Sequence, residues 1–264
     1  VDDDSYPDIV YLESETIRWW RNNGGDGTFT SGGSFGATGC GPAGDIMTAD
    51  WSGDGYDDMM VACMYRSDSL LFIHQPATSD FGVPISVGTM YNPAGIQAVD
   101  MDGDNDLDVL VSGNGQHVND QAGVARQMWF ENVNGDGITW ATHDVAMAPT
   151  ARLFAQLLDA DGDGDWDVVA NDVDNLFYGS IKLHINNAPL DSFTETQAFT
   201  YKYPPRFMGP GGVSHSDFDG DGHDDFASYC YFHYGNSDLT FTPVSVDFAG
   251  CDESVAHAIH FYMD

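Results

Sequence analysis

The sequence predicts an all-β protein built from five repeats. A nine-residue segment rich in Asp and Gly returns about every 50 residues, and a short apolar run follows each copy. The clearest copy is Asp159–Asp167, followed by Val168-Val169-Ala170. Short apolar runs between clusters of Gly, Asn and Asp are typical of strands, and a fixed period of this length is typical of repeat architectures. We find no amphipathic helix pattern and no apolar run long enough to span a membrane.

The Asp-rich segment has the chemistry of a calcium loop. Asp159, Asp161 and Asp163 would crowd three negative charges into one turn, which is unfavourable unless a cation lies among them. Oxygen ligands suit Ca²⁺, which binds about 6–8 of them, and the intervening glycines can take positive φ. An EF-hand is excluded because its twelfth position requires Glu and is Ala170 here. A strand pattern rather than a helix follows the loop.

The other copies keep the same register and define five loops. Loops two, three, four and five are residues 50–58, 100–108, 159–167 and 217–225. Loop one is complete when Asp264 is placed before residues 1–8. Two copies depart from the pattern, because Ser52 replaces the second carboxylate of loop two and Asp3 stands where the other loops have Gly.

Each repeat offers about four short strands, which is the content of one propeller blade. The predicted strands are residues 9–12, 17–22, one beginning at 28–30, 45–49, 71–75, 128–132, 138–145, 181–187, 192–194 and 239–242. A Gly-rich turn such as Asn134-Gly135-Asp136-Gly137 separates the third strand of a repeat from the fourth.

The third repeat carries a resemblance to a known family. Its Asp-rich loop, apolar strand, Trp129-Phe130-Glu131-Asn132, Asn-Gly turn and final His143-Asp144-Val145 resemble the FG-GAP/VCBS calcium-binding propeller repeat, which also builds the head of integrin α-subunits. The resemblance implies a single domain over residues 1–264, either a five-bladed β-propeller or part of a six- to eight-bladed one.

The resemblance also implies a ligand set for about five Ca²⁺ ions. In this family the side chains at loop positions one, three, five and nine bind the ion, together with the backbone carbonyl of position seven. The implied side chains are Asp264, Asp2, Asp4 and Asp8; Asp50, Ser52, Asp54 and Asp58; Asp100, Asp102, Asp104 and Asp108; Asp159, Asp161, Asp163 and Asp167; Asp217, Asp219, Asp221 and Asp225. The residues at position seven are Tyr6, Tyr56, Asp106, Asp165 and His223.

Charge and cysteine content indicate the setting of the protein. The formal net charge is −34, from 42 acidic and 8 basic residues. Such a chain repels nucleic acid and anionic membranes. A halophile-type acidic surface is the alternative, but more than half of the acidic residues lie in the five loops, which favours metal binding.

Four cysteines suggest two local disulfides, Cys40–Cys63 and Cys230–Cys251. There is no CxxC pair, so neither a zinc site nor a redox motif is expected. Disulfides and millimolar calcium both belong outside the cytosol, and we expect a secreted or cell-surface protein.

The chain ends suggest how the repeats close. Residues 259–263 would complete the blade that begins with residues 9–12, so that the ion of loop one clasps the ring. The alternative places Asp264 of one subunit against Val1 of the next, giving a head-to-tail oligomer.

Two function classes compete. Gly32-Gly33-Ser34-Phe35-Gly36 matches a nucleophile elbow, but its β context makes a chance match the better reading. A polysaccharide lyase or hydrolase would place its site at a channel end, around His215, His257, His260 and Arg152, and the scarcity of basic residues disfavours it.

Aromatic residues favour a structural, adhesion or glycan-binding module with a protein or glycan ligand. Of Trp19 and Trp20, one should face outward. The rings of Trp51, Tyr56 and Trp166, in or beside calcium loops, either stack on sugars or pack between blades.

Overall fold

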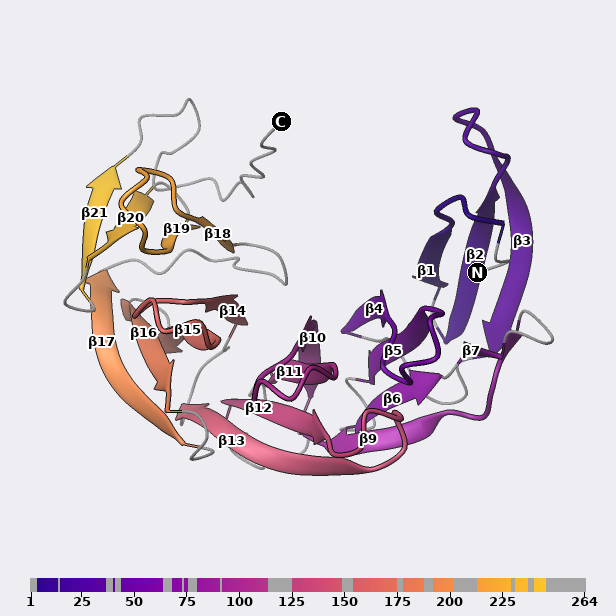
Figure 1. Cartoon of the computed structure of the whole chain (residues 1–264), viewed down its shortest axis with the longest axis horizontal. Coiled ribbons are helices and arrows are strands. Elements are labelled where there is room, and N and C mark those ends of the chain that lie inside the picture. The colour runs from indigo at the N-terminus through magenta and orange to yellow at the C-terminus, as the bar shows by residue number, and fades with distance from the viewer. Residues whose placement is uncertain are drawn as a thin grey trace. The chain divides into compact units, whose positions relative to one another are not determined.

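The computed structural model describes most of the chain. The described residues are 4–13, 15–36, 40, 44–63, 68–72, 74–75, 80–90, 92–113, 125–148, 154–174, 178–187, 192–201, 213–228, 231–236 and 240–245. Every regular element among them is a strand, so the all-β class that the sequence predicts is confirmed (Figure 1).

The strands form five sheets of three or four strands, each drawn from consecutive segments of the chain (Figure 1). The first sheet has the order β1 (Ile9–Glu13), β2 (Thr16–Asn22), β3 (Phe29–Gly36). The second has β4 (Asp45–Ala49), β5 (Asp58–Cys63), β6 (Asp68–Phe72), β9 (Ile85–Thr89), and β7 (His74–Gln75) pairs separately with β8 (Asp80–Phe81). The third has β10 (Pro93–Val99), β11 (Asp108–Gly113), β12 (Ala125–Asn132), β13 (Trp140–Ala148). The fourth has β14 (Phe154–Leu158), β15 (Asp167–Asp174), β16 (Tyr178–Asn186), β17 (Phe193–Tyr201). The fifth has β18 (Val213–Ser216), β19 (Asp225–Ser228), β20 (Tyr231–Gly235), β21 (Phe241–Ser245).

The sequence placed these strands well and missed some ends. The strand expected at 71–75 is interrupted, because β6 ends at Phe72 and β7 begins at His74. The strand expected from 138 begins at Trp140, since the Ile138 amide donates to Asp136 Oδ1 (2.9 Å) and belongs to the turn. The strand expected from 239 begins at Phe241. The closing strand expected at 259–263 lies outside the described residues.

The second strands of the second and third sheets are fully buried. Every residue of β5 and β11 is buried. A strand covered on both faces reads as a continuous apolar run rather than an alternating one, which explains the runs that follow the Asp-rich loops. Each of these strands begins with the Asp at loop position nine, so the loop and the core strand are anchored at the same residue.

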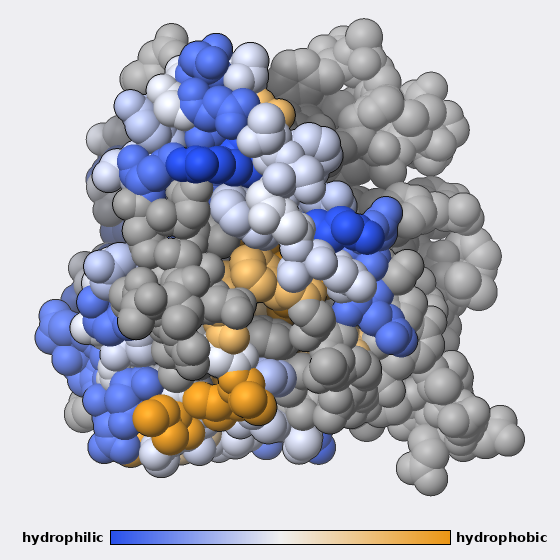
Figure 2. Space-filling view, turned by 90° about the vertical axis from the view of Figure 1, so that its right-hand side faces the viewer, coloured by the Kyte–Doolittle hydropathy of each residue, from blue (hydrophilic) through white to orange (hydrophobic). Residues whose placement is uncertain are grey.

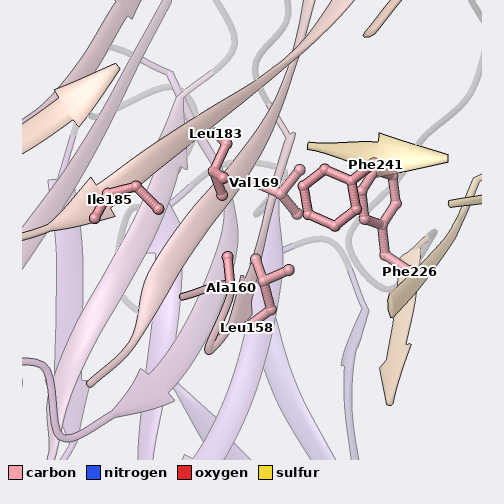
Figure 3. Close-up of a cluster of buried hydrophobic side chains, with 7 residues drawn as sticks. All are labelled: Leu158, Ala160, Val169, Leu183, Ile185, Phe226 and Phe241. Atoms are coloured by element: carbon pink, nitrogen blue, oxygen red, sulfur yellow. The ribbon is translucent and has the colours of Figure 1, made fainter. Parts of the chain in front are cut away.

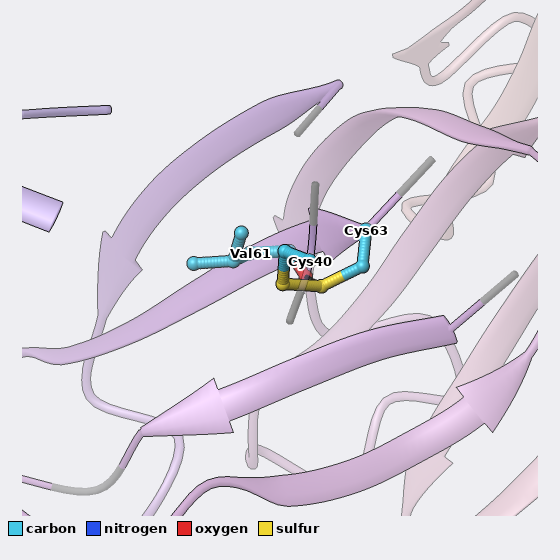
Figure 4. The surroundings of a disulfide bond; sticks show 3 residues. All are labelled: Cys40, Val61 and Cys63. Carbon is cyan, nitrogen blue, oxygen red and sulfur yellow. Dashed lines mark hydrogen bonds between the residues drawn. A yellow bond between two sulfur atoms is a disulfide. The ribbon is translucent and has the colours of Figure 1, made fainter. Parts of the chain in front are cut away.

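Two compact units divide the chain, the first comprising residues 1–99, 105–111 and 129–142 and the second residues 100–104, 112–128 and 143–264. A core cluster of the first unit contains Ile17, Met59, Val61 and a disulfide between Cys40 and Cys63. Figure 4 shows Val61 beside this disulfide. The bond joins the chain ahead of loop two to the end of β5, as the sequence predicted. Cys230 and Cys251 lie outside the described residues.

The second unit contains a core cluster shared by β14, β15, β16, β19 and β21. Its members are Leu158, Ala160, Val169, Leu183, Ile185, Phe226 and Phe241. Figure 3 shows the rings of Phe226 and Phe241 next to each other beside Val169, and their centroids are 4.9 Å apart. The fourth and fifth sheets therefore pack on each other through aliphatic and aromatic contacts next to loops four and five.

On the face drawn in Figure 2, hydrophilic residues prevail among those described and hydrophobic residues gather in small areas. Among the residues that the structure describes, no helix has the length and hydropathy needed to cross a membrane.

Candidate metal centres in the Asp-rich loops

Four of the Asp-rich loops, loops two to five, each connect the first strand of a sheet to its second strand. Loop two joins β4 to β5, loop three joins β10 to β11, loop four joins β14 to β15, and loop five joins β18 to β19. Both flanking strands are fixed by pairing, for example from Phe154↔Asn171 to Leu158↔Asp167 at loop four. The loop therefore has little freedom beyond the path that its own residues choose.

The Asp at loop position one organises the turn. The amides of Gly162 and Asp163 donate to Asp159 Oδ1 (2.8 and 3.1 Å), and the amide of Gly164 donates to Oδ2 (3.1 Å). The same three bonds recur in loop five around Asp217. Gly162 and Gly164 have φ of 75° and 94°, values that favour residues without Cβ.

The Asp at position nine ties the loop to the sheet. Asp167 is fully buried and accepts two backbone hydrogen bonds of 2.8 Å, from Ala160 to Oδ2 and from Asn186 of β16 to Oδ1. Asp225 makes the corresponding pair with Phe218 and Gly235, both 2.7 Å. Position nine thus holds both the start of its own loop and the end of the third strand.

Three loops bring carboxylate oxygens from positions one, three and nine within 4.8 Å of one another. These groups are Asp100, Asp102 and Asp108; Asp159, Asp161 and Asp167; Asp217, Asp219 and Asp225. Nine of the side chains named from the sequence are therefore assembled as the loop spacing predicts.

The negative charges of the loop four carboxylates are energetically unfavourable when no cation is bound. Burial, with smaller contributions from neighbouring carboxylates, raises the pKa of Asp167 to about 7. Burial and the adjacent Asp163 raise the pKa of Asp165 to about 6. Burial also raises the pKa of Asp161 and of Asp225 in loop five. Raised carboxyl pKa values mean that the folded loop disfavours its own charge.

Some side-chain atoms in the loops are buried and have no hydrogen-bond partner. Among them are Ser52 Oγ, at position three of loop two, and Asp165 Oδ1, at position seven of loop four. Buried polar atoms are normally satisfied, so these atoms fit a ligand that donates no proton. The crowded carboxylates and the unpartnered oxygens together form an all-oxygen set, which suits a hard cation such as Ca²⁺ and not a thiolate- or imidazole-preferring metal.

The raised pKa values predict that calcium binding weakens in acid. A protonated carboxyl group must lose its proton to bind the ion, so the affinity of loop four should fall as pH drops through about 7, the pKa of the expected side-chain ligand Asp167. We expect binding about 10-fold weaker at pH 6 than at pH 8. Calorimetric titrations in buffers of different ionisation enthalpy would measure the released protons, and binding without proton release would contradict this prediction.

A tryptophan ties loop two to the third sheet within the first unit. Trp51, at loop position two, is fully buried, and its indole Nε1 donates to the backbone oxygen of Asp108 (3.2 Å). In return, Asn132 Nδ2 of β12 donates to the backbone oxygen of Trp51 (2.8 Å), while the Asn132 amide donates to Asp108 Oδ1 (2.8 Å). Loop two and position nine of loop three therefore share one hydrogen-bond network.

The second unit repeats half of this network. Asn186 Nδ2 donates to the backbone oxygen of Met101, at position two of loop three (3.0 Å), and the Asn186 amide donates to Asp167 Oδ1. The sequence interpretation missed these asparagines as functional residues. The signal was present, because Asn22, Asn132 and Asn186 each end the strand that pairs with the strand following an Asp-rich loop.

The remaining expected residues divide into three groups. In loop one, Asp264 and Asp2 lie outside the described residues, whereas Asp8 accepts the Asn22 amide at 2.9 Å, as position nine does elsewhere. At position five, Asp54, Asp163 and Asp221 accept the amides of Tyr56, Asp165 and His223, and Asp104 donates its amide to Asp102 Oδ1. At position one of loop two, Asp50 accepts the amides of Asp54 and Gly55.

The aromatic side chains separate into buried and exposed ones. Trp51 packs within the fold, as the packing alternative predicted, whereas Trp20, Tyr56 and Trp166 are 40%, 39% and 37% exposed. Trp19 is half-buried, so the expectation that one residue of the pair faces outward is confirmed.

The described part of the structure does not bring together the residues that the enzyme hypothesis placed at a channel end. Arg152, His257 and His260 lie outside the described residues, and His215 is described only as part of β18. The apparent nucleophile elbow lies within β3, which has no strand-to-helix turn.

The fold and the loops define a β-sheet repeat protein with Asp-rich loops that could hold metal ions. The family model of the FG-GAP-like repeat matches residues 1–61 and 50–111. These residues belong to the FG-GAP repeat family, and the resemblance read from the sequence is confirmed. The two matches end at Val61 and Val111, each the third residue after loop position nine, so their register is that of the loops. No curated protein matches the chain.

Proposed function

We propose that the protein is a calcium-stabilised β-propeller module that acts outside the cell in adhesion, glycan recognition or the building of a surface structure. The observation that carries this proposal is the recurrence of three carboxylate groups, each with oxygens within 4.8 Å, at equivalent loop positions. Five sheets of consecutive strands and the FG-GAP-like repeats of residues 1–111 support blades as the repeating unit.

The proposed ions lie in loops two to five, and in loops three, four and five the described carboxylates already have oxygens within 4.8 Å of one another. Positions one, three, five and nine supply side chains, and position seven supplies a backbone carbonyl. Ser52 contributes a neutral oxygen in loop two, which predicts a weaker site there because affinity depends on ligand charge. The chemistry that the ion supplies is charge neutralisation: it holds together carboxylates that otherwise repel one another.

The proposed location outside the cell is based on the disulfide and on the repeat family. The Cys40–Cys63 disulfide and the FG-GAP-like repeats are consistent with an extracellular protein, and we propose secretion or display at the cell surface. Head-to-tail association through the termini is the proposed route to a homo-oligomer.

The proposed ligand is a glycan or a protein that meets aromatic side chains beside the loops. Tyr56 and Trp166 lie within loops two and four and are partly exposed. Aromatic faces stack on apolar sugar faces. The hydroxyl group of Tyr and the indole N–H group of Trp can also form hydrogen bonds at a partly solvated surface. Order in the loops would then be required for the aromatic surface to keep its shape.

A glycan array probed in calcium and in chelator tests this proposal. The expected result is binding in calcium that disappears on chelation and falls at least about 10-fold in Trp166→Ala or Tyr56→Ala, the loss of a buried aromatic contact. Val83→Ala is the matched control, because Val83 is a highly exposed apolar residue outside the loops. Binding that survives chelation unchanged would contradict a role for the calcium loops in recognition.

A further inference from the structure

Loop one already contains a cation. The guanidinium of Arg21 donates from Nη2 to Asp4 Oδ2 at 3.1 Å, and Asp4 stands at position five, one of the positions expected to bind calcium. The other oxygen, Asp4 Oδ1, accepts the Tyr6 amide at 3.0 Å. Asp54, Asp163 and Asp221 accept the amide two residues onward in the same way. Asp4 therefore keeps the usual loop geometry while its second oxygen is held by a positive side chain.

The strand register places Arg21 at this loop. Ile9 pairs with Trp20, and the amide of Asn22 donates to Asp8 Oδ1 at 2.9 Å. Arg21 lies between these two anchors, so the β1–β2 pairing fixes its backbone beside loop one.

No other described repeat has a basic residue at the position of Arg21. The pairing Val168↔His184 makes Ile185 its counterpart beside loop four. The pairing Phe226↔His233 makes Tyr234 the counterpart beside loop five. The bond from the Asn132 amide to Asp108 makes Glu131 the counterpart beside loop three. Among loops one, three, four and five, the described residues therefore place a positive side chain at this position beside loop one alone, and the counterpart beside loop two, residue 73, lies outside the described residues.

Loop one also places a side chain in a strained backbone conformation. Ser5 has φ of 73° at position six, where loops two, four and five have Gly55, Gly164 and Gly222 and loop three has Asn105 with φ of 74°. A side chain in this left-handed region is strained relative to Gly, so the turn is retained against a local cost. An attraction between Asp4 and Arg21 opposes that cost.

We propose that the Arg21 guanidinium takes the place of calcium beside Asp4, so that residues 4–8 keep their hydrogen bonds without the ion and loop one takes up none while Arg21 is present. The proposal rests on the proposed calcium role of the other loops. A divalent ion at loop one would have to approach the guanidinium, and it would compete for a carboxylate that already forms a charge-assisted hydrogen bond. The first repeat is then independent of calcium, whereas loops four and five depend on it.

The test combines ion counting with hydrogen exchange, using calcium as the only probe. Native mass spectrometry of the full chain should count one more bound Ca²⁺ in Arg21→Gln than in the unmodified protein. Arg18→Gln is the matched control, because Arg18 lies on the same strand, is similarly exposed and contacts Glu13 outside the loop. The control should bind the unmodified number of ions.

Hydrogen exchange supplies a readout inside the loop. In the unmodified protein, peptides containing Tyr6 and Asn22 should keep their protection when calcium is chelated, whereas peptides containing Gly164 and Gly222 should lose it. In Arg21→Gln the Tyr6 peptide should become sensitive to chelation. An unchanged ion count in Arg21→Gln, or loss of Tyr6 protection on chelation of the unmodified protein, would overturn the proposal. If loops four and five take up no ion, the calcium function itself fails, so the two failures are distinguishable.

Discussion

Replacing Asp167 with Asn is expected to lower the free energy of unfolding by about 3 kcal/mol in calcium, the cost of breaking a buried charged network. Both oxygens of Asp167 accept backbone amides, from Ala160 and Asn186. The Asn side chain can accept only through Oδ1, and its Nδ2 would face the second amide donor to donor. The same substitution removes a predicted calcium ligand of loop four, so we expect one fewer bound ion.

The sign of the calcium dependence makes this prediction specific. Without the ion, the ionised carboxylate of Asp167 is itself unfavourable, because burial raises its pKa to about 7. The destabilisation by Asp167→Asn should therefore be much smaller in chelator than in calcium. Urea unfolding in both conditions measures the difference.

Asp144→Asn is the matched control for this experiment. Asp144 is exposed and forms an ion pair of 3.5 Å with Arg126, so its neutralisation should change stability by less than about 0.5 kcal/mol in either condition. An equal loss for Asp167→Asn with and without calcium would show that position nine acts only as a hydrogen-bond acceptor.

Truncation of Trp51 to Ala is expected to destabilise the protein by about 3–5 kcal/mol, the range for large buried aromatic residues. The indole is fully buried and donates to the backbone of Asp108. Truncation leaves a cavity, frees that carbonyl and removes the packing that positions the Asn132 contact to the backbone of residue 51. Thermal unfolding measures the effect, and it should be followed by far-ultraviolet circular dichroism, which monitors the backbone rather than tryptophan fluorescence.

Two further variants separate packing from hydrogen bonding at this site. Trp51→Phe keeps most of the ring and loses the Nε1 donor, so we expect a loss of about 1 kcal/mol, the net worth of one hydrogen bond, plus a small packing term. Trp166→Ala removes a loop tryptophan that is 37% exposed and should cost far less than Trp51→Ala. Equal effects of Trp51→Ala and Trp166→Ala would contradict the packing role of Trp51.

The sequence predicted those features that depend on local spacing. Alternating Asp and Gly fix a turn whose amides point to position one, and the apolar run that follows marks a strand covered on both faces. The loop carboxylates of Asp159, Asp161 and Asp167 meet because only a few residues separate them. The Cys40–Cys63 pairing was accessible for the same reason, since it joins neighbouring segments of one repeat.

Contacts between residues that are far apart in the sequence could not be predicted from the sequence. The Asn132 side chain meets the backbone of Trp51 across 81 residues, and a local pattern carries no information about which carbonyl will be opposite. The sequence likewise did not distinguish Trp51 from Trp166. The packing alternative placed both between blades, which is wrong for Trp166, since its side chain is 37% exposed. The pairing of Arg21 with Asp4 required the register of β1 and β2, which fixes the strand position above the loop.

Native mass spectrometry of the full chain, first in calcium and then after chelation, tests the central claim most directly. The account predicts four bound Ca²⁺ ions per chain, one for each of loops two to five, and their complete loss on chelation. It also predicts that the ion of loop two leaves first, since Ser52 replaces a carboxylate there. A chain that binds no calcium, or one ion at most, would contradict the assignment of the Asp-rich loops as metal centres.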